Sequence, residues 1–298
     1  MMAALQQTLR GSLKLNEPMA RHTSWRVGGP AERYYEPADL DDLTEFLSQQ
    51  DKTEALMWLG LGSNLLVRDG GIRGTVIITS GLLNEIELLE EGLVRVEAGV
   101  ACAKAARFCA RQRLIGVEFL AGIPGTMGGA LAMNAGAFGG ETWQHVVAVE
   151  TIDGNGQRHL RQPEEFVVNY RHVKAVPGEW FVAAHLRLHQ GDSETATTRI
   201  KELLEKRNTS QPIGLPSCGS VFRNPEGDHA ARLIEISGLK GSCIGGACVS
   251  DKHANFIINT GAATAADIEA LIERVAAEVE SQHGVQLIRE VHIVGEVA

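Results

Sequence analysis

The sequence has little positive charge, few aromatic side chains and no long apolar run. Lys and Arg number 28 against 37 Asp and Glu, the formal net charge is −9, and aromatic residues make up 5% of the chain. Nucleic-acid binding needs a stripe of basic side chains, so this balance argues against a nucleic-acid partner. Because no run of about twenty apolar residues occurs and residues 1–16 lack an apolar core, we expect neither a membrane span nor a secretory signal. We therefore expect a soluble, cytoplasmic protein that is a monomer or a weak oligomer.

Cysteine is also scarce, and its spacing excludes the usual metal and redox motifs. The cysteines are Cys102, Cys109, Cys218, Cys243 and Cys248, and none of them forms a Cys-x-x-Cys pair. An odd number of cysteines without a secretory signal predicts reduced thiols. Cys243, Cys248 and His253 match no zinc spacing, so we expect no metal site. Cys102 and Cys109 share one face of a predicted helix and are expected to fill a core.

Glycine, by contrast, is abundant, with 33 residues in a chain of 298. The densest stretch is 121–140, in which seven positions are glycine and no side chain is charged. Glycine admits positive φ and lets a ligand approach the main chain, so successive N–H groups there predict a diphosphate site. A helix beginning near Gly128 would add its positive end. The alternative is a glycine-rich turn that merely packs closely.

A second glycine stretch, Leu59-Gly-Leu-Gly-Ser-Asn-Leu-Leu-Val67, is typical of a strand, a tight loop and a second strand. Leu65 replaces the third glycine of the Gly-x-Gly-x-x-Gly dinucleotide motif, and no Gly-x-x-x-x-Gly-Lys-Ser/Thr motif occurs. Two such loops far apart in the sequence suggest one elongated ligand. They favour a dinucleotide cofactor bound outside the Rossmann pattern.

The composition fits a loop-rich α/β or α+β enzyme. Hydrophobic periodicity and capping signals predict helices over 39–50, 101–113, 193–208, 229–237 and 265–283. Apolar runs and, over 84–89 and 93–98, alternating apolar residues predict strands over 56–59, 65–67, 76–79, 84–89, 93–98, 146–152, 180–189 and 286–294. These elements suggest three parts, 1–80, 81–206 and 207–298, with the option that the last strand returns to the first part.

Six motifs then occur in order along nearly the whole chain. They are His22-Thr-Ser-Trp-Arg-Val-Gly-Gly-Pro30, Gly60-Leu-Gly-Ser-Asn64, Ala121-Gly-Ile-Pro-Gly125, Asn169-Tyr-Arg171, Gly219-Ser-Val-Phe-Arg-Asn-Pro225 and Glu290-Val-His-Ile-Val-Gly295. Together they closely resemble the UDP-N-acetylenolpyruvoylglucosamine reductases of bacterial cell-wall synthesis, in their shorter, second type. The resemblance implies an α+β fold, in which a two-subdomain FAD-binding fold of the vanillyl-alcohol-oxidase (PCMH) type precedes a C-terminal α+β substrate-binding domain.

The resemblance also implies non-covalent FAD, NADPH as reductant, and reduction of the enolpyruvyl ether of a sugar nucleotide to the lactyl ether of UDP-N-acetylmuramate. This reaction serves peptidoglycan synthesis, and hence cell shape and division. The cofactor residues are expected in the two glycine stretches: Gly60, Gly62, Ser63, Asn64, Leu65, Gly122, Ile123, Pro124, Gly125, Thr126, Gly128, Gly129, Asn134 and Gly136. His22 is expected to be a structural donor rather than a flavin attachment point or a base.

Three residues resemble the catalytic residues of the family. Arg171 is expected to meet the substrate carboxylate, which a guanidinium binds bidentately. Ser220 resembles the proton donor, although an alcohol must be polarised or must relay a proton to act as one. Glu290 resembles the carboxylate that stabilises or protonates the enol-like intermediate, which requires partial burial and a raised pKa.

On the substrate side the chain departs from the longer form of the family, which carries a tyrosine at the position of Phe138 and a lysine at that of Gln211. Contacts to the diphosphate of the substrate are therefore expected from Arg207, Arg223 or Lys252, together with Gln211 and Asn224. Two alternatives stay open. One is another flavin oxidoreductase of the same fold that acts on a hydroxy acid or sugar, and the other is a catalytically silent nucleotide-binding protein.

Overall fold

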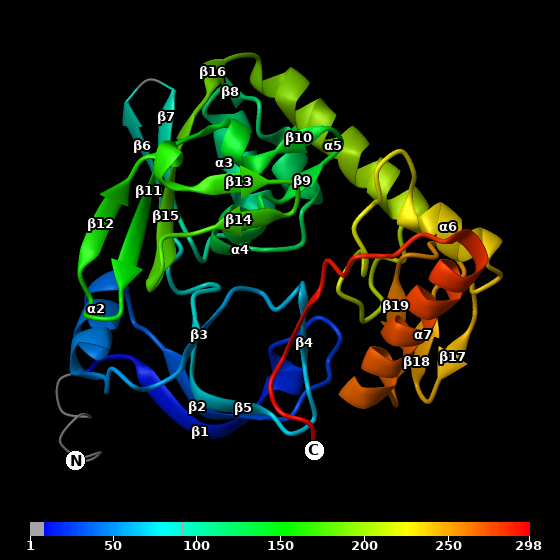
Figure 1. Cartoon of the computed structure of the whole chain (residues 1–298). Helices are drawn as coiled ribbons and strands as arrows, with labels where there is room; N and C mark the ends of the chain where they lie inside the picture. Colours follow the sequence, from blue (N-terminus) through cyan, green and yellow to red (C-terminus); the bar gives the residue numbers. More distant parts are fainter. Residues whose placement is uncertain (1–8, 91) are drawn as a thin grey trace. The chain divides into compact units, whose positions relative to one another are not determined.

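The computed structural model describes residues 9–90 and 92–298 (Figure 1). Its α-helices are α2 (Leu40–Gln49), α3 (Cys102–Arg111), α4 (Met127–Met133), α5 (Ser193–Ser210), α6 (Ala230–Ile236) and α7 (Ala265–His283). Its strands up to residue 141 are β1 (Ser12–Pro18), β2 (Pro30–Glu36), β3 (Leu56–Leu59), β4 (Leu65–Val67), β5 (Ile72–Ile78), β6 (Ile86–Glu90), β7 (Leu93–Glu97), β8 (Leu114–Ile115), β9 (Gly136–Ala137) and β10 (Gly140–Glu141).

The later strands are β11 (Val146–Asp153), β12 (Arg158–Arg161), β13 (Val167–Asn169), β14 (His172–Lys174), β15 (Glu179–Arg187), β16 (His189–Gln190), β17 (Cys243–Ile244), β18 (Ala247–Val249), β19 (Ile257–Asn259) and β20 (His292–Val294). The predicted helices and the 84–98 hairpin are confirmed to within a few residues. In the described part of the chain, no helix is both long enough and apolar enough to cross a membrane.

The chain divides into two compact units. The described part of unit 1 comprises 9–14, Arg33–Leu61 and Gly74–Glu205, and unit 2 comprises Leu15–Glu32, Gly62–Arg73 and Lys206–Ala298. The chain passes between the units inside β1, β2, β5 and α5, where the sequence carries no break in composition. The three-part division expected from the sequence stays a prediction.

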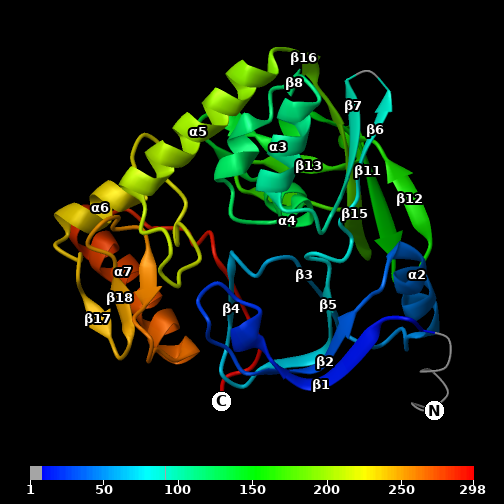
Figure 2. The ribbon, with the colours of Figure 1, turned by 180° about the vertical axis from the view of Figure 1, so that it is seen from behind.

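Unit 1 is built on an antiparallel sheet with the strand order β12-β11-β15-β7-β6. Val94 and Val96 of β7 point into the core, while Arg95 and Glu97 between them lie on the other face, as the alternation of a strand requires. Helices α3 and α4 cover the Val94 face (Figures 1 and 2). Cys102 and Cys109 of α3 are buried in this core, and burial raises the pKa of both thiols to about 12, so both are core fillers as predicted.

Unit 2 is organised around α7, which packs on a sheet with the order β17-β18-β19 (Figure 1). The helix begins at a capping box in which Thr264 and Asp267 exchange side-chain and backbone hydrogen bonds. Trp25, from the first motif of the sequence, is fully buried and donates from Nε1 to the carbonyl of Ile257 in β19 at 2.7 Å. Strand β20 pairs in parallel with β4, so the carboxyl-terminal segment lies beside residues 65–67.

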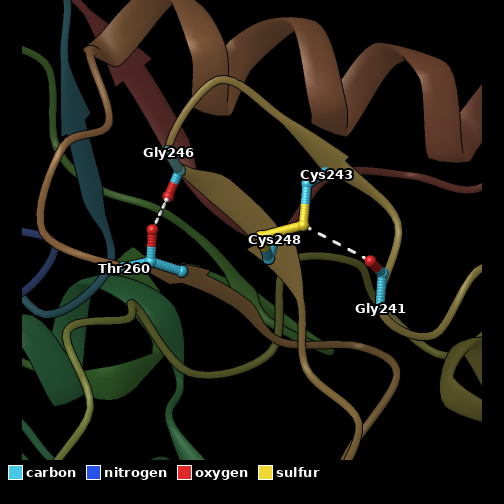
Figure 3. Close-up of a disulfide and its surroundings, with 5 residues drawn as sticks. All are labelled: Gly241, Cys243, Gly246, Cys248 and Thr260. Atoms are coloured by element: carbon cyan, nitrogen blue, oxygen red, sulfur yellow. Dashed lines mark hydrogen bonds between the residues drawn. A yellow bond between two sulfur atoms is a disulfide. The ribbon is translucent and has the colours of Figure 1, made fainter.

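The structure corrects the prediction that all thiols are reduced. Cys243 and Cys248 form a disulfide, and the Sγ atom of Cys243 lies 3.3 Å from the carbonyl oxygen of Gly241 (Figure 3). The two cysteines are direct partners in the β17–β18 hairpin, with Cα atoms 4.2 Å apart. The sequence spacing alone could not reveal that a turn at Gly245 places the two residues opposite each other.

The strand predicted over 286–294 is also corrected. Only His292–Val294 is a strand, whereas Arg289 forms an isolated antiparallel bridge with Phe222. Residues 286–291 are rich in strand-forming apolar side chains, but beyond this bridge they have no regular ladder to join. The segment that carries Glu290 is therefore held by individual hydrogen bonds.

Candidate active site

The glycine stretch of unit 1 contains the helix start expected near Gly128. Thr126 caps α4, and its Oγ1 accepts from the amide of Gly129 at 3.5 Å. The amide of Met127 donates to Val100 at 2.9 Å, and that of Gly128 donates to Ala98 at 2.8 Å. The first amides of this short helix are thus occupied inside unit 1. The expectation that they form the open, positive end of an anion site is therefore wrong, because neighbouring carbonyls already use them.

The amides of the other glycine loop are open. Residues 60–64 donate no backbone hydrogen bond to any other part of the described chain. Gly62 is buried with φ +64°, and a Cβ there would lie 2.0 Å from the carbonyl oxygen of His22. Consecutive unbonded N–H groups on a glycine loop form a concavity suited to an anion. The diphosphate of a dinucleotide fits this loop better than it fits the start of α4.

The two glycine stretches meet within unit 1. A Cβ on Gly60 would lie 2.5 Å from Oγ1 of Thr126, so glycine is needed for the close approach. Gly122 is similarly tight, since a Cβ there would lie 2.7 Å from the ring of Phe138. The sequence-predicted cofactor residues Gly60 and Thr126 are therefore neighbours, as one elongated ligand requires.

Asn134 has a structural use at the end of α4. It is 3% exposed and adopts a left-handed conformation with φ +40°. Its Nδ2 donates to Oε2 of Glu141 at 3.0 Å, and its Oδ1 accepts from the amide of Trp143 at 3.2 Å. Because both ends of the side chain are bonded inside the fold, Asn134 shapes the stretch from within.

Arg171 lies at the turn of the β13–β14 hairpin with φ +54°. Its Nη2 donates to the carbonyl of Gly136 at 2.6 Å, and its Nη1 donates to that of Asn134 at 3.3 Å. The guanidinium also lies 5.1 Å from the ring centroid of Tyr170. These contacts orient the cation beside the glycine stretch of unit 1.

Ser220 and Glu290 lie on neighbouring segments of unit 2. The amide of Glu290 donates to the carbonyl of Val221 at 2.8 Å, and the amide of Arg223 donates to Ile288 at 2.9 Å. Gly219 precedes Ser220 in a left-handed conformation with φ +82°. Burial, and to a smaller extent the charge of Glu290, raise the pKa of the Cys218 thiol. The structure thus brings two of the three sequence-predicted catalytic residues together, and Arg171 belongs to the other unit.

Asn64 connects the cofactor loop to this pair. Its Nδ2 donates to the carbonyl of Glu290 at 3.1 Å, and its own carbonyl accepts from the amide of His292 at 3.1 Å. Sequence reasoning assigned Asn64 to the cofactor alone. Its second role depends on the parallel pairing of β4 with β20, for which a single sequence carries no signal.

The predicted substrate residues of unit 2 include cations without acidic partners. In the described ranges, no carboxylate forms an ion pair with Arg207, Arg223 or Lys252. Burial lowers the pKa of Arg207, whose Nε donates to Oε1 of Gln211 at 3.0 Å. The Nε atom of Arg223 is buried without a hydrogen-bond partner. Arg207 and Arg223 are partly buried, and a cation taken from water without a counter-ion is costly, so their guanidinium groups suit an anionic ligand, while Lys252 is exposed.

Two of the predicted substrate residues, Lys252 and Asn224, form hydrogen bonds to the backbone of the fold. Lys252 Nζ donates to the carbonyl of Asn208, the residue after Arg207, at 2.6 Å. Asn224 Oδ1 accepts from the amide of Ala230 at 3.1 Å, at the start of α6. Asn224 therefore stabilises the entry of a helix, and its Nδ2 group is the part of the side chain that a substrate would meet.

Comparison with known proteins decides the family. A protein of Alkalilimnicola ehrlichii named UDP-N-acetylenolpyruvoylglucosamine reductase is 62% identical over 296 residues, which cover 99% of this chain and 99% of that protein. The chain belongs to the UDP-N-acetylenolpyruvoylglucosamine reductase family. Reductases of the same name from Methylococcus capsulatus and Legionella pneumophila are 61% and 60% identical, each covering 96% of this chain and 94% of the relative.

Domain and structure comparisons agree with membership in the reductase family. Residues 31–160 match the family model of an FAD binding domain, and 211–294 match that of the UDP-N-acetylenolpyruvoylglucosamine reductase C-terminal domain. The crystal structure of the reductase from Thermus caldophilus superimposes with a TM-score of 0.82 at 33% identity, covering 96% of this chain and 99% of that one. The α+β fold class and the FAD cofactor are confirmed. The protein is an FAD-containing oxidoreductase of peptidoglycan synthesis, with NADPH implied as reductant.

Proposed function

We propose that this chain reduces the enolpyruvyl ether of UDP-N-acetylglucosamine enolpyruvate to the lactyl ether of UDP-N-acetylmuramate, with electrons from NADPH. FAD, when bound and reduced, supplies a hydride for the vinyl methylene carbon. The observation that carries the proposal is the 2.8 Å hydrogen bond from Glu290 to Val221, which joins the Glu290 segment to the residue after Ser220. A reductase that adds a hydride to a double bond needs such a proton donor and a stabilising group on one face of the substrate.

The three catalytic residues have separate tasks in this proposal. Negative charge that develops beside the methylene carbon delocalises into the substrate carboxylate, which Arg171 binds through its guanidinium. Ser220 delivers a proton to the carbon that bears the ether oxygen. Glu290 stabilises the enol-like form and polarises the proton donor.

The substrate diphosphate is bound by the cations of unit 2. Arg207 and Arg223 contribute guanidinium groups that have no acidic partner among the described residues, and Lys252 adds an ammonium group near the end of α5. Gln211 orients Arg207 through its Oε1 atom. Asn224 contacts the sugar nucleotide with its amide. These residues replace the tyrosine and lysine that the longer form of the family carries.

The flavin diphosphate is bound by the amides of residues 60–64, with Thr126 and the glycines at 122, 125 and 136 shaping the surroundings. This proposal gives Asn134 a supporting role, because its side chain is fully bonded inside unit 1. We also expect the protein to act in the cytoplasm as a monomer or weak oligomer, in the three-part division stated above.

A two-stage absorbance experiment tests the proposed reaction. Under anaerobic conditions, NADPH should bleach the yellow FAD-loaded protein, and the enolpyruvyl sugar nucleotide should restore the colour. Pyruvate and glyoxylate, the oxidised forms of the hydroxy acids lactate and glycolate, serve as controls and should leave the protein bleached. Recovery of colour with such a keto acid, but not with the sugar nucleotide, would instead indicate a different flavin oxidoreductase.

A further inference from the structure

Asn255 binds the main chain directly after Ser220. Its side chain is 4% exposed, its Oδ1 accepts from the amide of Phe222 at 3.0 Å, and its Nδ2 donates to the carbonyl of Phe222 at 2.8 Å. Its own carbonyl accepts from the amide of Val221 at 2.9 Å. Asn255 therefore makes three hydrogen bonds to two consecutive residues, in the pattern that a neighbouring strand would make.

The Glu290 segment binds the same stretch of main chain from the other side. The carbonyl of Val221 accepts from the amide of Glu290 at 2.8 Å, while the amide of Val221 is used by Asn255. Residues 221 and 222 belong to no strand and have only the isolated bridge to Arg289. The position of this segment, and of Ser220 before it, thus depends on Asn255 on one side and on the Glu290 segment on the other.

We propose that Asn255 is a positioning residue that holds Ser220 in register with Glu290 for the proton transfer. The inference rests on the proposed role of Ser220 as proton donor. An amide side chain suits the task because it offers one acceptor and one donor to the two backbone groups of a single residue. Aspartate would face the carbonyl of Phe222 with a second acceptor, and alanine would offer neither group.

Loss of these bonds has a consequence beyond stability. Phe222 is 1% exposed, so its amide and carbonyl would be left buried without partners. The segment would shift to find other partners, and Ser220 would move with it. A displacement of about 1 Å at a reacting group can cost about a hundredfold in rate.

A matched control exists in the same unit. Asn259 is 7% exposed, donates from Nδ2 to the carbonyl of Trp25 at 2.9 Å, and accepts at Oδ1 from the amides of Gly261 at 2.8 Å and Ala263 at 3.2 Å. Asn259→Ala thus removes at least as many buried bonds as Asn255→Ala. It leaves the bonds of residues 221 and 222 untouched.

The experiment measures the two half-reactions separately by stopped-flow absorbance, on FAD-loaded wild type, Asn255→Ala, Asn255→Asp, Asn259→Ala and Ser220→Ala. We expect Asn255→Ala to be reduced by NADPH within about twofold of the wild-type rate and to be reoxidised by the enolpyruvyl sugar nucleotide about 10- to 100-fold more slowly. Its solvent deuterium isotope effect on reoxidation should rise, because proton transfer becomes more rate-limiting. Asn259→Ala should leave the ratio of the two rates unchanged.

Two outcomes would overturn the inference. One is an Asn255→Ala protein whose reoxidation slows no more than that of Asn259→Ala, and the other is an equal loss in both half-reactions. If Asn255→Ala does not fold, Asn255→Asp is measured in its place, because it keeps the acceptor for the amide of Phe222. The ratio of its reduction rate to its reoxidation rate is then compared with that of Asn259→Ala. If Ser220→Ala is reoxidised at the wild-type rate, the role of Ser220 itself is refuted. If Ser220→Ala is reoxidised slowly but the Asn255 variants are reoxidised at the wild-type rate, only the positioning role is refuted.

Discussion

At the scale of single residues, Gly62 is the position of the cofactor loop with the least room for a side chain. A left-handed conformation costs a non-glycine residue about 1–2 kcal/mol. At Gly62 the carbonyl oxygen of His22 would also lie 2.0 Å from the new Cβ. We predict that Gly62→Ala displaces the amides of the loop and that the purified protein loses most of its FAD, measured as the ratio of flavin to protein absorbance.

Gly227 supplies the control for this variant. It has φ +75°, and a Cβ added there would meet no atom within 4 Å, so Gly227→Ala adds backbone strain without a clash. We expect Gly227→Ala to lower the free energy of unfolding by about 1 kcal/mol and to keep its FAD. Full flavin content in Gly62→Ala would show that the loop does not hold the cofactor.

Ser220 should affect only the half of the reaction that uses the substrate. We predict that Ser220→Ala is reduced by NADPH nearly as fast as wild type, because no proton is delivered to a carbon in that step. Its reoxidation by the enolpyruvyl sugar nucleotide should slow by about 100-fold or more, since general acid catalysis contributes about 10²–10⁴-fold. Stopped-flow absorbance measures both rates, and equal losses in the two would speak against a proton donor at this position.

These residues also show how far the sequence could predict the site. Glycine-rich motifs identified both stretches, because positive φ and close approach depend on the residue type itself. The use of the α4 amides could not be predicted, since their acceptors Val100 and Ala98 lie in another segment. The same reason hides the bond between Asn64 and Glu290, and the three bonds of Asn255.

At the scale of elements, three strands of unit 1 share a partly buried ion cluster. Arg95 of β7 donates to Glu150 of β11 from Nε at 2.6 Å and from Nη2 at 2.8 Å, and His185 of β15 lies 2.8 Å from the same carboxylate. Burial alone would raise the pKa of Glu150, but the bonds to Arg95 and His185 outweigh it and hold this pKa at about 2. The cluster thus favours the charged carboxylate in the folded protein.

This shift predicts a pH dependence of stability. A carboxyl whose pKa is lower in the folded than in the unfolded state stabilises the fold above the unfolded pKa, and that stabilisation is lost as the pH falls towards the folded pKa. We predict that Glu150→Gln lowers the free energy of unfolding on the order of 2 kcal/mol at pH 7, and that the difference shrinks between about pH 4.5 and 2. Urea titrations across this range measure it, with the exposed Glu164→Gln as control. A difference that does not change with pH would contradict the role of the charge.

The β17–β18 hairpin carries a second prediction at this scale. In denaturant without reductant, thiol titration should find three free cysteines, Cys102, Cys109 and Cys218, and reduction should raise the number to five. The ring is short, so the chain-entropy model gives a stabilisation of only about 2 kcal/mol, and dithiothreitol should lower the melting temperature of wild type slightly. A Cys243→Ser, Cys248→Ser protein should not respond to dithiothreitol. Five reactive thiols without reductant would refute the disulfide. A reducing compartment favours free thiols, so this outcome is a real alternative.

Elements with their own local signals were predicted well. Helix α7 begins and ends at the predicted residues because Thr264 caps its start and Gly284 adopts the left-handed conformation at its end. The segment before β20 was predicted less well, because apolar residues such as Leu287 and Ile288 favour a strand even where the segment forms no ladder. A strand depends on pairing with distant residues, which local patterns do not contain.

At the scale of the whole molecule, the two compact units contribute different residues to the proposed chemistry. Unit 1 holds Arg171 and the glycine stretch around α4, and unit 2 holds Ser220, Glu290 and the cations proposed for the substrate diphosphate. The cofactor loop 60–64 contains one of the points at which the chain passes from unit 1 to unit 2. The matched domains follow this division only in part, because the C-terminal domain, 211–294, lies within unit 2, whereas the FAD binding domain, 31–160, also includes the unit 2 segment Gly62–Arg73.

The most direct test of the central claim is the identity of the product. The FAD-loaded protein is incubated with NADPH and UDP-N-acetylglucosamine enolpyruvate, and the sugar nucleotide is then analysed by mass spectrometry while NADPH oxidation is followed. The account predicts a product heavier than the substrate by two hydrogen atoms, with one NADPH oxidised for each molecule formed. An unchanged sugar nucleotide, with NADPH oxidised only when oxygen is present, would contradict it.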